Sequence, residues 1–455
     1  MLTTPSPDRR SGGSVCVMPR PVTLDAFTDR YAQRTHGMTA SEIRALFAVA
    51  SRPEVVSLAG GMPNLSALPL DAVGKLVGEL ISSRGTQALQ YGSGQGDPRL
   101  RELICEVMAL EGVQASAEDV VVTVGSQQAL DLVTRVFIDP GDVVLAEAPS
   151  YVGALGTFAA YQAEVVHVAM DADGLVPEAL REAITRVQAA GKRAKFLYTV
   201  PNFHNPAGVS LAESRRDEVL AICQAAGLMV LEDNPYGLLG FDAPPVPAIR
   251  ARGANARGDS DDVLYLGSFS KTFAPGLRVG WVLAPHAVRE KLVLAAEAAV
   301  LCPPQLNQMV VAEYLATQDW QGQIAAFRGM YRERRDAMLD ALTQQMPEGT
   351  TWTHPAGGFY VWVTLPGELD SKVLLPRAVT ARVAFVPGTA FYADGSGRQS
   401  MRLSYCYPEP DRIREGVRRL ATVLEEEVEL RATFGATGPL RPSRPQAESP
   451  SPDLA

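Results

Sequence analysis

The chain has 455 residues, of which 46% are hydrophobic and 20% charged, and its formal net charge is −9. This length is sufficient for two packed domains, and the acidic balance argues against a surface that binds nucleic acid. The sequence has no uninterrupted apolar run of about 18 residues or more, so we expect no membrane-spanning helix. The scattered cysteines and histidines show no metal-ligand spacing. We therefore expect reduced thiols, no metal site and a cytoplasmic protein without a signal peptide.

Composition divides the chain into five parts. Residues 1–22 and 434–455 are rich in Pro, Ser, Gly and Arg, and we expect these tails to be disordered. Residues 23–60 are expected to pack on a small domain and on the active site. Residues 61–303 are expected to form a large domain and residues 304–433 the small one.

Short apolar runs alternate with helical patterns in the large domain. In chain order, the expected strands cover 120–124, 143–147, 163–170, 195–200, 228–233, 262–268 and 278–284. Helices are expected after the first strand, from about Tyr151, and from a capping box formed by Ser210 and Glu213. Apolar strands separated by helices are typical of a mostly parallel sheet that helices cover on both faces. The large domain is therefore predicted to be α/β.

The pattern changes after about residue 303. A long helical region, 305–345, precedes alternating strands at 358–365, 383–388 and 401–406, and a last amphipathic helix begins near Asp411. Helices and strands in this order predict a smaller α+β domain.

Several polar motifs follow the expected strands of the large domain, where ligands bind in such sheets. In "VTVGSQQAL" (122–130), a strand is followed by a glycine and a helix start, so the N–H groups of Ser126 and Gln127 can bind phosphate. By itself this motif also fits an ordinary tight turn. The glycine-rich stretch 91–100 follows no clear strand and is not a dinucleotide fingerprint.

Three further motifs follow later strands. Asn202 and Asn205 lie in "PNFHNPAG", although asparagine before proline is also common in plain turns. Asp233 ends a strand, where its carboxylate can either hold a buried cation or cap the turn. In "LGSFSKTFAPGLRVGW" (266–281), Lys271 stands alone between hydroxyl residues, with Arg278 seven residues further on.

The order of these motifs along the chain resembles that in the fold-type-I pyridoxal-phosphate enzymes of the class I/II aminotransferase family. A phosphate-binding helix start comes first, followed by asparagines, a carboxylate, and a lysine with an arginine. The resemblance covers about residues 25–430. It rests on "YGSGQGDPRLRE", "GSQQALDL", "PSY" (149–151), "PNFHNPAG", "DNPYG", "SFSKTFAPGLRVGW", "PAGGFYVWV" and "MRLSYC". Residues 41–64 are similar to the N-terminal segment of the kynurenine/2-aminoadipate aminotransferase group.

The resemblance implies a role in cofactor binding for each matching residue. Lys271 would form a Schiff base with the cofactor aldehyde and act as the catalytic base, and Asp233 would pair with the pyridine nitrogen. Tyr236 and Asn205 would bind the ring oxygen, and Tyr151 would stack on the ring. The phosphate would be held by Gly125, Ser126, Gln127, Ser268, Ser270 and Arg278. Tyr91 would reach the phosphate of a neighbouring subunit, which implies a homodimer with shared sites.

The resemblance also implies a substrate site. Arg402 would hold the α-carboxylate with a bidentate fork, near Asn202, Asn205 and Gly61. Arg44 lies off the apolar stripe of its expected helix, so it is either a solvated arginine or a ligand for a distal carboxylate.

The implied activity is transfer of an amino group from an L-amino acid to a 2-oxo acid. The expected donors are 2-aminoadipate, aromatic and branched-chain amino acids, and the expected acceptor is 2-oxoglutarate. Two alternatives stay open, a carbon–sulfur lyase or other elimination enzyme of the same fold and, more remotely, a ligand-sensing domain of a transcriptional regulator.

Overall fold

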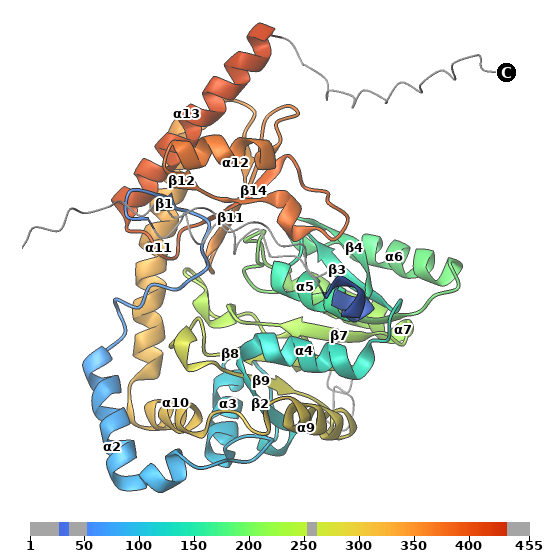
Figure 1. Ribbon diagram of the computed structural model, residues 1–455, viewed down its shortest axis with the longest axis vertical. Helices are drawn as coiled ribbons and strands as arrows, with labels where there is room; N and C mark the ends of the chain where they lie inside the picture. Colours follow the sequence, from blue (N-terminus) through green and yellow to red (C-terminus); the bar gives the residue numbers. More distant parts are fainter. Residues whose placement is uncertain (1–26, 36–51, 253–261, 435–455) are drawn as a thin grey trace, which may run out of the picture.

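The computed structural model describes residues 27–35, 52–252 and 262–434 (Figure 1). The two predicted tails lie outside the described residues, apart from Phe434, and so does Arg44. In the described part of the chain, no helix is both long and apolar enough to cross a membrane.

The large domain is built on a sheet with the strand order β2-β9-β8-β7-β6-β3-β4-β5 (Figure 1). The strands are β2 (Val120–Val124), β3 (Val143–Ala148), β4 (Glu164–Asp171), β5 (Gly174–Leu175), β6 (Ala194–Thr199), β7 (Met229–Asp233), β8 (Val263–Ser268) and β9 (Val279–Leu283). Strands β4, β3, β6, β7 and β8 pair in parallel, and β9 runs antiparallel between β8 and β2. The carboxyl ends of β2, β3, β6, β7 and β8 therefore meet at one edge of the sheet, as the sequence predicted.

Helices cover both faces of this sheet because successive strand residues point to opposite sides. Val143 and Leu145 of β3 lie in one core with Leu180 and Val219, which belong to α6 (Pro177–Ala189) and α7 (Glu213–Ala225). Val144 and Ala146 instead join the core that contains the helices α4 (Gly125–Phe137) and α5 (Val152–Ala160). Strands buried on both faces are apolar throughout, which explains the continuous apolar runs in the sequence.

The small domain contains an antiparallel sheet with the order β10-β11-β14-β13. The strands are β10 (Thr351–Trp352), β11 (Tyr360–Thr364), β13 (Val386–Pro387) and β14 (Ser400–Ser404). Beside it lie α11 (Trp320–Gln345), α12 (Ser371–Thr380) and α13 (Pro410–Phe434), and α11 packs along α13 (Figure 1). The predicted strand 383–388 is divided, because β12 (Val383–Ala384) pairs with β1 (Val56–Ser57) in a separate sheet. The end of the N-terminal segment thus packs on the small domain.

Two local features differ from the sequence-based expectation. Helix α10 (Gln305–Thr317) packs on α2 (Leu70–Ala88) and α3 (Pro98–Ala109) of the large domain, so the boundary predicted at 303/304 precedes a helix that contacts the large domain. The predicted capping box is wrong. Ala212 is the N-cap of α7, and the Ser210 hydroxyl instead accepts a hydrogen bond from the Phe203 backbone N–H at 2.9 Å.

Candidate active site

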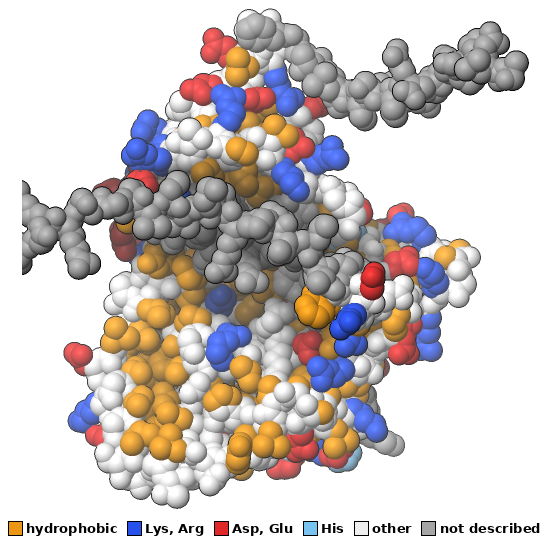
Figure 2. All heavy atoms as spheres, viewed as in Figure 1, with side chains coloured by type: hydrophobic (Ala, Val, Ile, Leu, Met, Phe, Trp, Pro, Cys, Tyr) orange, Lys and Arg blue, Asp and Glu red, His pale blue; other side chains and the backbone are white. Residues whose placement is uncertain are grey.

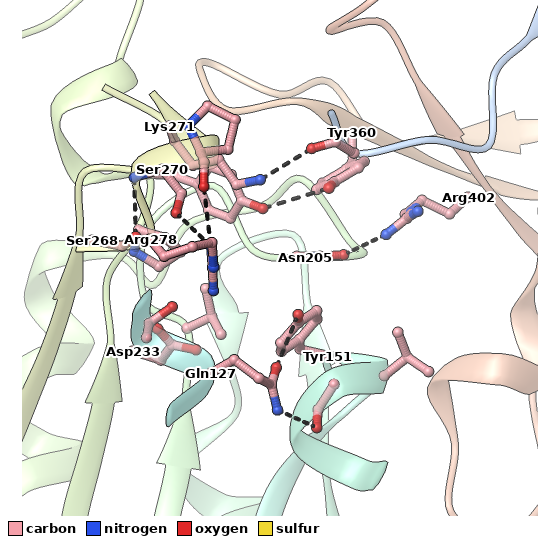
Figure 3. Close-up of a pocket in the computed structure, with 18 residues that line it drawn as sticks. Gln127, Tyr151, Asn205, Asp233, Ser268, Ser270, Lys271, Arg278, Tyr360 and Arg402 are labelled. Atoms are coloured by element: carbon pink, nitrogen blue, oxygen red, sulfur yellow. Dashed lines mark hydrogen bonds between the residues drawn. The ribbon is translucent and has the colours of Figure 1, made fainter. Parts of the chain in front are cut away.

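A cavity of about 380 Å³ lies at the carboxyl edge of the central sheet. Twelve of the residues predicted from the sequence line it, namely Gly61, Ser126, Gln127, Tyr151, Asn205, Asp233, Tyr236, Ser268, Ser270, Lys271, Arg278 and Arg402. Figure 3 shows Lys271, Ser270 and Arg278 on one side of the cavity, and Arg402 with Asn205 on the other. The parallel sheet brings most of these residues together because their loops follow strands that end at the same edge, whereas Gly61 comes from the N-terminal segment and Arg402 from β14 of the small domain.

One end of the cavity is suited to a phosphate. Gly125 begins α4 with φ +73°, and an added Cβ would lie 2.3 Å from Nη2 of Arg278, so only glycine fits there. The backbone N–H groups of the first helical turn, including those of Ser126 and Gln127, have no carbonyl partners within the helix. Arg278 donates to the Ser270 hydroxyl at 3.4 Å. A helix N-terminus together with a guanidinium and hydroxyl groups is a donor set for a dianion.

Lys271 follows β8 and points into the cavity (Figure 3). Its Nζ donates to the carbonyl oxygen of Gly61 at 3.0 Å. Burial lowers the pKa of Lys271 to about 8, and the charges of Arg402 and Arg278 act in the same direction. The amine is therefore much closer to its neutral, nucleophilic form at neutral pH than an exposed lysine is.

Asp233 ends β7, and both its oxygens are buried. Its Oδ2 accepts a hydrogen bond from the Tyr198 hydroxyl at 2.8 Å, whereas Oδ1 has no partner among the described residues. Burial raises the pKa of Asp233 to about 6, and the hydrogen bond from Tyr198 opposes this rise. A buried carboxylate oxygen without a donor is costly, so Oδ1 is suited to a protonated ring nitrogen.

Arg402 of β14 is fully buried between aromatic rings. Its Cζ lies 4.2 Å from the ring centroid of Tyr360 and 5.0 Å from that of Phe391. It donates to Asn205 Oδ1 at 2.9 Å and to the carbonyl oxygen of Ala59 at 2.7 Å, while its Nε has no partner among the described residues. This rigid guanidinium retains N–H groups for a carboxylate. Asn205 thus holds Arg402, a contact that the sequence did not predict.

Three tyrosines line the space between Arg402 and the phosphate end. Burial raises the pKa of Tyr151 to about 12, and the pKa of Tyr236 also lies well above its ordinary value. The hydroxyl groups of Tyr236 and Tyr360 lie 3.5 Å apart. All three phenols are therefore protonated donors at neutral pH. Tyr151 also donates to the side chain of Gln127 at 3.4 Å.

Sequence reasoning missed Tyr198 and Tyr360. Each occupies a position in an apolar strand, β6 and β11, where a tyrosine reads as core packing. Tyr360 also explains Gly61, because a Cβ at residue 61 would lie 2.2 Å from the Tyr360 hydroxyl oxygen. The only available signal was a hydroxyl group in an otherwise apolar run, which is weak by itself.

Although Gly125 adjoins Arg278 at the phosphate end, four predicted site residues, namely Gly125, Asn202, Tyr91 and Arg44, are not among those that line this cavity. Asn202 is buried behind it, where Arg216 Nη2 donates to its Oδ1 at 2.5 Å, so its prediction as a substrate ligand is wrong. Its place in a buried network follows from tertiary packing. Tyr91 is 76% exposed and does not line the cavity of its own chain. Arg44 lies outside the described residues. No group of His, Cys, Asp or Glu in the described part of the chain is arranged to hold a metal ion.

The cavity residues fit the cofactor that the resemblance implied. The helix N-terminus with Arg278 matches a phosphate, the unpartnered Oδ1 of Asp233 matches a pyridinium nitrogen, and Lys271 supplies a buried amine. The guanidinium of Arg402 on the opposite wall matches the carboxylate of an amino acid. This arrangement can hold a phosphorylated aromatic aldehyde beside an amino acid.

Comparisons with known proteins agree with this geometry. The sequence model of the family described as aminotransferase class I and II matches residues 53–420. The aromatic-amino-acid aminotransferase 1 of Thermococcus litoralis is 40% identical over 408 residues, which cover 89% of this chain and 96% of that protein.

Two crystal structures are similar over the same extent. The kynurenine aminotransferase of Pyrococcus horikoshii, in complex with PMP, has a TM-score of 0.84 at 38% identity and covers 89% of this chain and 99% of its own. The α-aminoadipate aminotransferase of Thermus thermophilus was solved with N-(5′-phosphopyridoxyl)-L-leucine. It has a TM-score of 0.82 at 36% identity and covers 89% of this chain and 100% of its own.

Proposed function

This chain belongs to the class I and II aminotransferase family and is a pyridoxal-phosphate-dependent transaminase of fold type I, and from this premise we propose its substrates. The donor is 2-aminoadipate or an aromatic or branched-chain L-amino acid, and the acceptor is 2-oxoglutarate. One observation carries the proposal. A buried amine, Lys271, and a buried guanidinium, Arg402, line opposite walls of one cavity of about 380 Å³.

When bound, pyridoxal phosphate supplies an aldehyde carbon that takes up the amino group and a ring that accepts the electrons released at Cα. Lys271 moves the proton. Because its pKa is lowered to about 8, Nζ can accept the Cα proton and give it back at nearly neutral pH. Asp233, through Oδ1, holds the proton on the ring nitrogen.

Arg402 fixes the substrate relative to Lys271. The rings of Tyr360 and Phe391 and the amide of Asn205 leave the guanidinium little freedom. A substrate carboxylate bound there would be held by the Arg402 guanidinium, which favours removal of the Cα proton over loss of CO₂. The lyase alternative lacks a comparable supporting observation.

The names of similar proteins support the donor classes. The Thermococcus protein is named for aromatic amino acids, and the Thermus structure combines an α-aminoadipate enzyme with a leucine adduct. Both an acidic and an apolar side chain are thus accommodated among similar proteins. For this chain we propose that Arg44 binds a distal carboxylate and swings out for apolar donors.

We further propose a homodimer in which Tyr91 reaches the phosphate of the partner subunit. Support comes from α2 and the loop after it, where Leu70, Leu89 and Tyr91 are 63%, 71% and 76% exposed. Figure 2 shows hydrophobic side chains gathered over α2 and the adjoining helices. An exposed apolar area of this kind is typical of an interface.

A panel of amino acids assayed with 2-oxoglutarate tests the proposed substrates. We expect glutamate formation with 2-aminoadipate and with aromatic or branched-chain donors. Release of pyruvate and ammonia from an amino acid without a 2-oxo acid would instead favour the elimination chemistry.

A further inference from the structure

A buried network of hydrogen-bonded polar side chains lies behind the cofactor cavity. Arg216 of α7 donates to Asn202 Oδ1, and Asn202 Nδ2 donates to Asn234 Oδ1 at 3.0 Å. Asn234 Nδ2 in turn donates to Glu111 Oε1 at 2.7 Å, and the Tyr265 hydroxyl donates to Glu111 Oε2 at 3.0 Å. All five residues are buried, and none lines the cavity.

The guanidinium of Arg216 fixes the direction of the hydrogen bonds that run through Asn202 and Asn234 to Glu111. A guanidinium only donates, so the oxygen of Asn202 must face Arg216 and its nitrogen must face Asn234. A carboxylate only accepts, so the nitrogen of Asn234 must face Glu111. Both amides therefore have one favourable orientation.

The Asn202–Asn234 bond joins the loop that carries Asn205 to the loop that carries Asp233 and Tyr236. Asn202 lies on the loop that carries Asn205, which holds Arg402. Asn234 directly follows Asp233 and precedes Tyr236. A change at this bond therefore alters the spacing between the groups that face the cofactor and those that face the substrate.

We propose that Glu111 is a positioning residue of the active site, which orients Asn234 and Asn202 and thereby fixes the two catalytic loops relative to each other. Glu111 lies after α3, far from these loops in sequence and outside every motif recognised above. The inference is independent of which amino acid is the donor, because it concerns the cofactor pocket.

The surroundings of Glu111 agree with this role. Burial raises its pKa to about 7, and the hydrogen bonds from Asn234 and Tyr265 oppose the rise. Asn234 and Tyr265 thus favour the ionised form of the carboxyl group to which they donate. Gly237 provides the necessary space, since a Cβ there would lie 1.9 Å from Glu111 Oε1.

Glu111→Gln and Glu111→Leu test the proposal in the full-length protein. Glutamine can accept from Asn234 and donate to the Tyr265 oxygen. Leucine removes the acceptor of the Tyr265 hydroxyl and leaves Asn234 Nδ2 only its longer hydrogen bond to the Tyr265 oxygen at 3.2 Å. Arg289→Leu is the control, because Arg289 is also a buried charged residue but donates to the carbonyl oxygen of Glu118, which precedes β2 at the opposite edge of the sheet. The measurements are the Kd for pyridoxal phosphate by absorbance titration of cofactor-free protein, and the melting temperature.

Removing the partners that orient metal ligands costs about 10–100-fold in affinity, and we expect the same range for cofactor binding in Glu111→Leu. Glu111→Gln should stay close to the wild type, and Arg289→Leu should lower the melting temperature without changing Kd. Equal Kd changes in Glu111→Leu and Arg289→Leu, or none in either, would overturn the proposal.

Gly237→Ala keeps the proposal testable even if Glu111→Leu does not fold. The added methyl group displaces Glu111 without removing it, so the cofactor should bind more weakly than in the wild type. Gly74→Ala is the control, because a Cβ at Gly74 meets nothing within 4 Å. An unchanged Kd in Gly237→Ala would contradict the assignment.

Discussion

Tyr198 donates a hydrogen bond to Oδ2 of Asp233 at 2.8 Å, and Oδ1 of the same carboxylate is buried without a partner among the described residues. Asp233 ends β7, and Tyr198 is the penultimate residue of the neighbouring parallel strand β6. This contact fixes the carboxylate of Asp233, which lines the cavity and keeps Oδ1 available for a donor. Tyr198 thus sets the orientation of the carboxylate, and Asp233 supplies the negative charge.

Asp233→Asn should lower kcat by about 10²–10⁴-fold, the range for a positioned catalytic group. The amide keeps the shape of the side chain but removes the charge that stabilises a protonated ring nitrogen. Cofactor binding should persist through Arg278 and the α4 N-terminus. Tyr198→Phe is the graded comparison, since it leaves the charge and removes only its fixed orientation. Near-normal turnover of Asp233→Asn would exclude this role.

The cofactor should be bound covalently to Lys271. Reduction of the holoenzyme with borohydride, followed by proteolysis and mass spectrometry, should yield one modified peptide that contains residue 271. Lys195 and Lys291 serve as internal controls, because neither lines the cavity. Modification of another lysine in place of Lys271 would refute the assignment.

Lys271 should make the stability of the cofactor-free protein depend on pH. Its pKa falls from 10.5 in a solvated lysine to about 8 in the folded protein. Between these values the unfolded chain binds the proton and the folded protein does not, so the lysine contribution to the free energy of unfolding rises with pH. Below about pH 8 both states are protonated, and the full cost of burying the charge remains.

Denaturant unfolding of the cofactor-free wild type and of Lys271→Met, from pH 7 to about pH 11, measures this contribution. The difference between the two proteins removes the titration of all other groups. We expect the wild type to gain stability relative to Lys271→Met as pH rises through this window. A constant difference would show that Lys271 has the same pKa in both states.

Arg44→Ala should weaken the use of 2-aminoadipate and glutamate and spare leucine and phenylalanine. A charge-assisted hydrogen bond contributes about 1.5–3 kcal/mol, which corresponds to about 10–150-fold in affinity. The measurement is kcat/KM for both donor classes, with Arg44→Lys as the variant that keeps the charge. An equal loss for acidic and apolar donors would assign Arg44 to closure of the site in place of substrate recognition.

The shared site predicts complementation between inactive chains. Lys271→Ala and Tyr91→Phe each damage one contribution, so a mixed dimer contains one site in which both residues are intact. Mixing the two variants after mild unfolding should therefore restore part of the activity. A protein that is monomeric and active at high dilution would rule out this arrangement.

The sequence by itself determined the sheet and most of the cavity. Continuous apolar strands separated by helices require a parallel sheet covered on both faces. The residues after those strands must then share one edge, which is why Gly125, Asp233 and Lys271 were placed together correctly. Apolar runs and the loops at strand ends are local properties, so a single sequence is sufficient to predict them.

Only the tertiary structure decided which polar groups became partners. Asn205 and Arg402 lie 197 residues apart, and Asn202, although only three residues from Asn205, faces the buried network behind the cavity. Ser210 closes a loop in place of capping α7. A polar side chain buried by the fold must find a donor or an acceptor, and that partner is supplied by packing between distant segments, which local patterns do not specify.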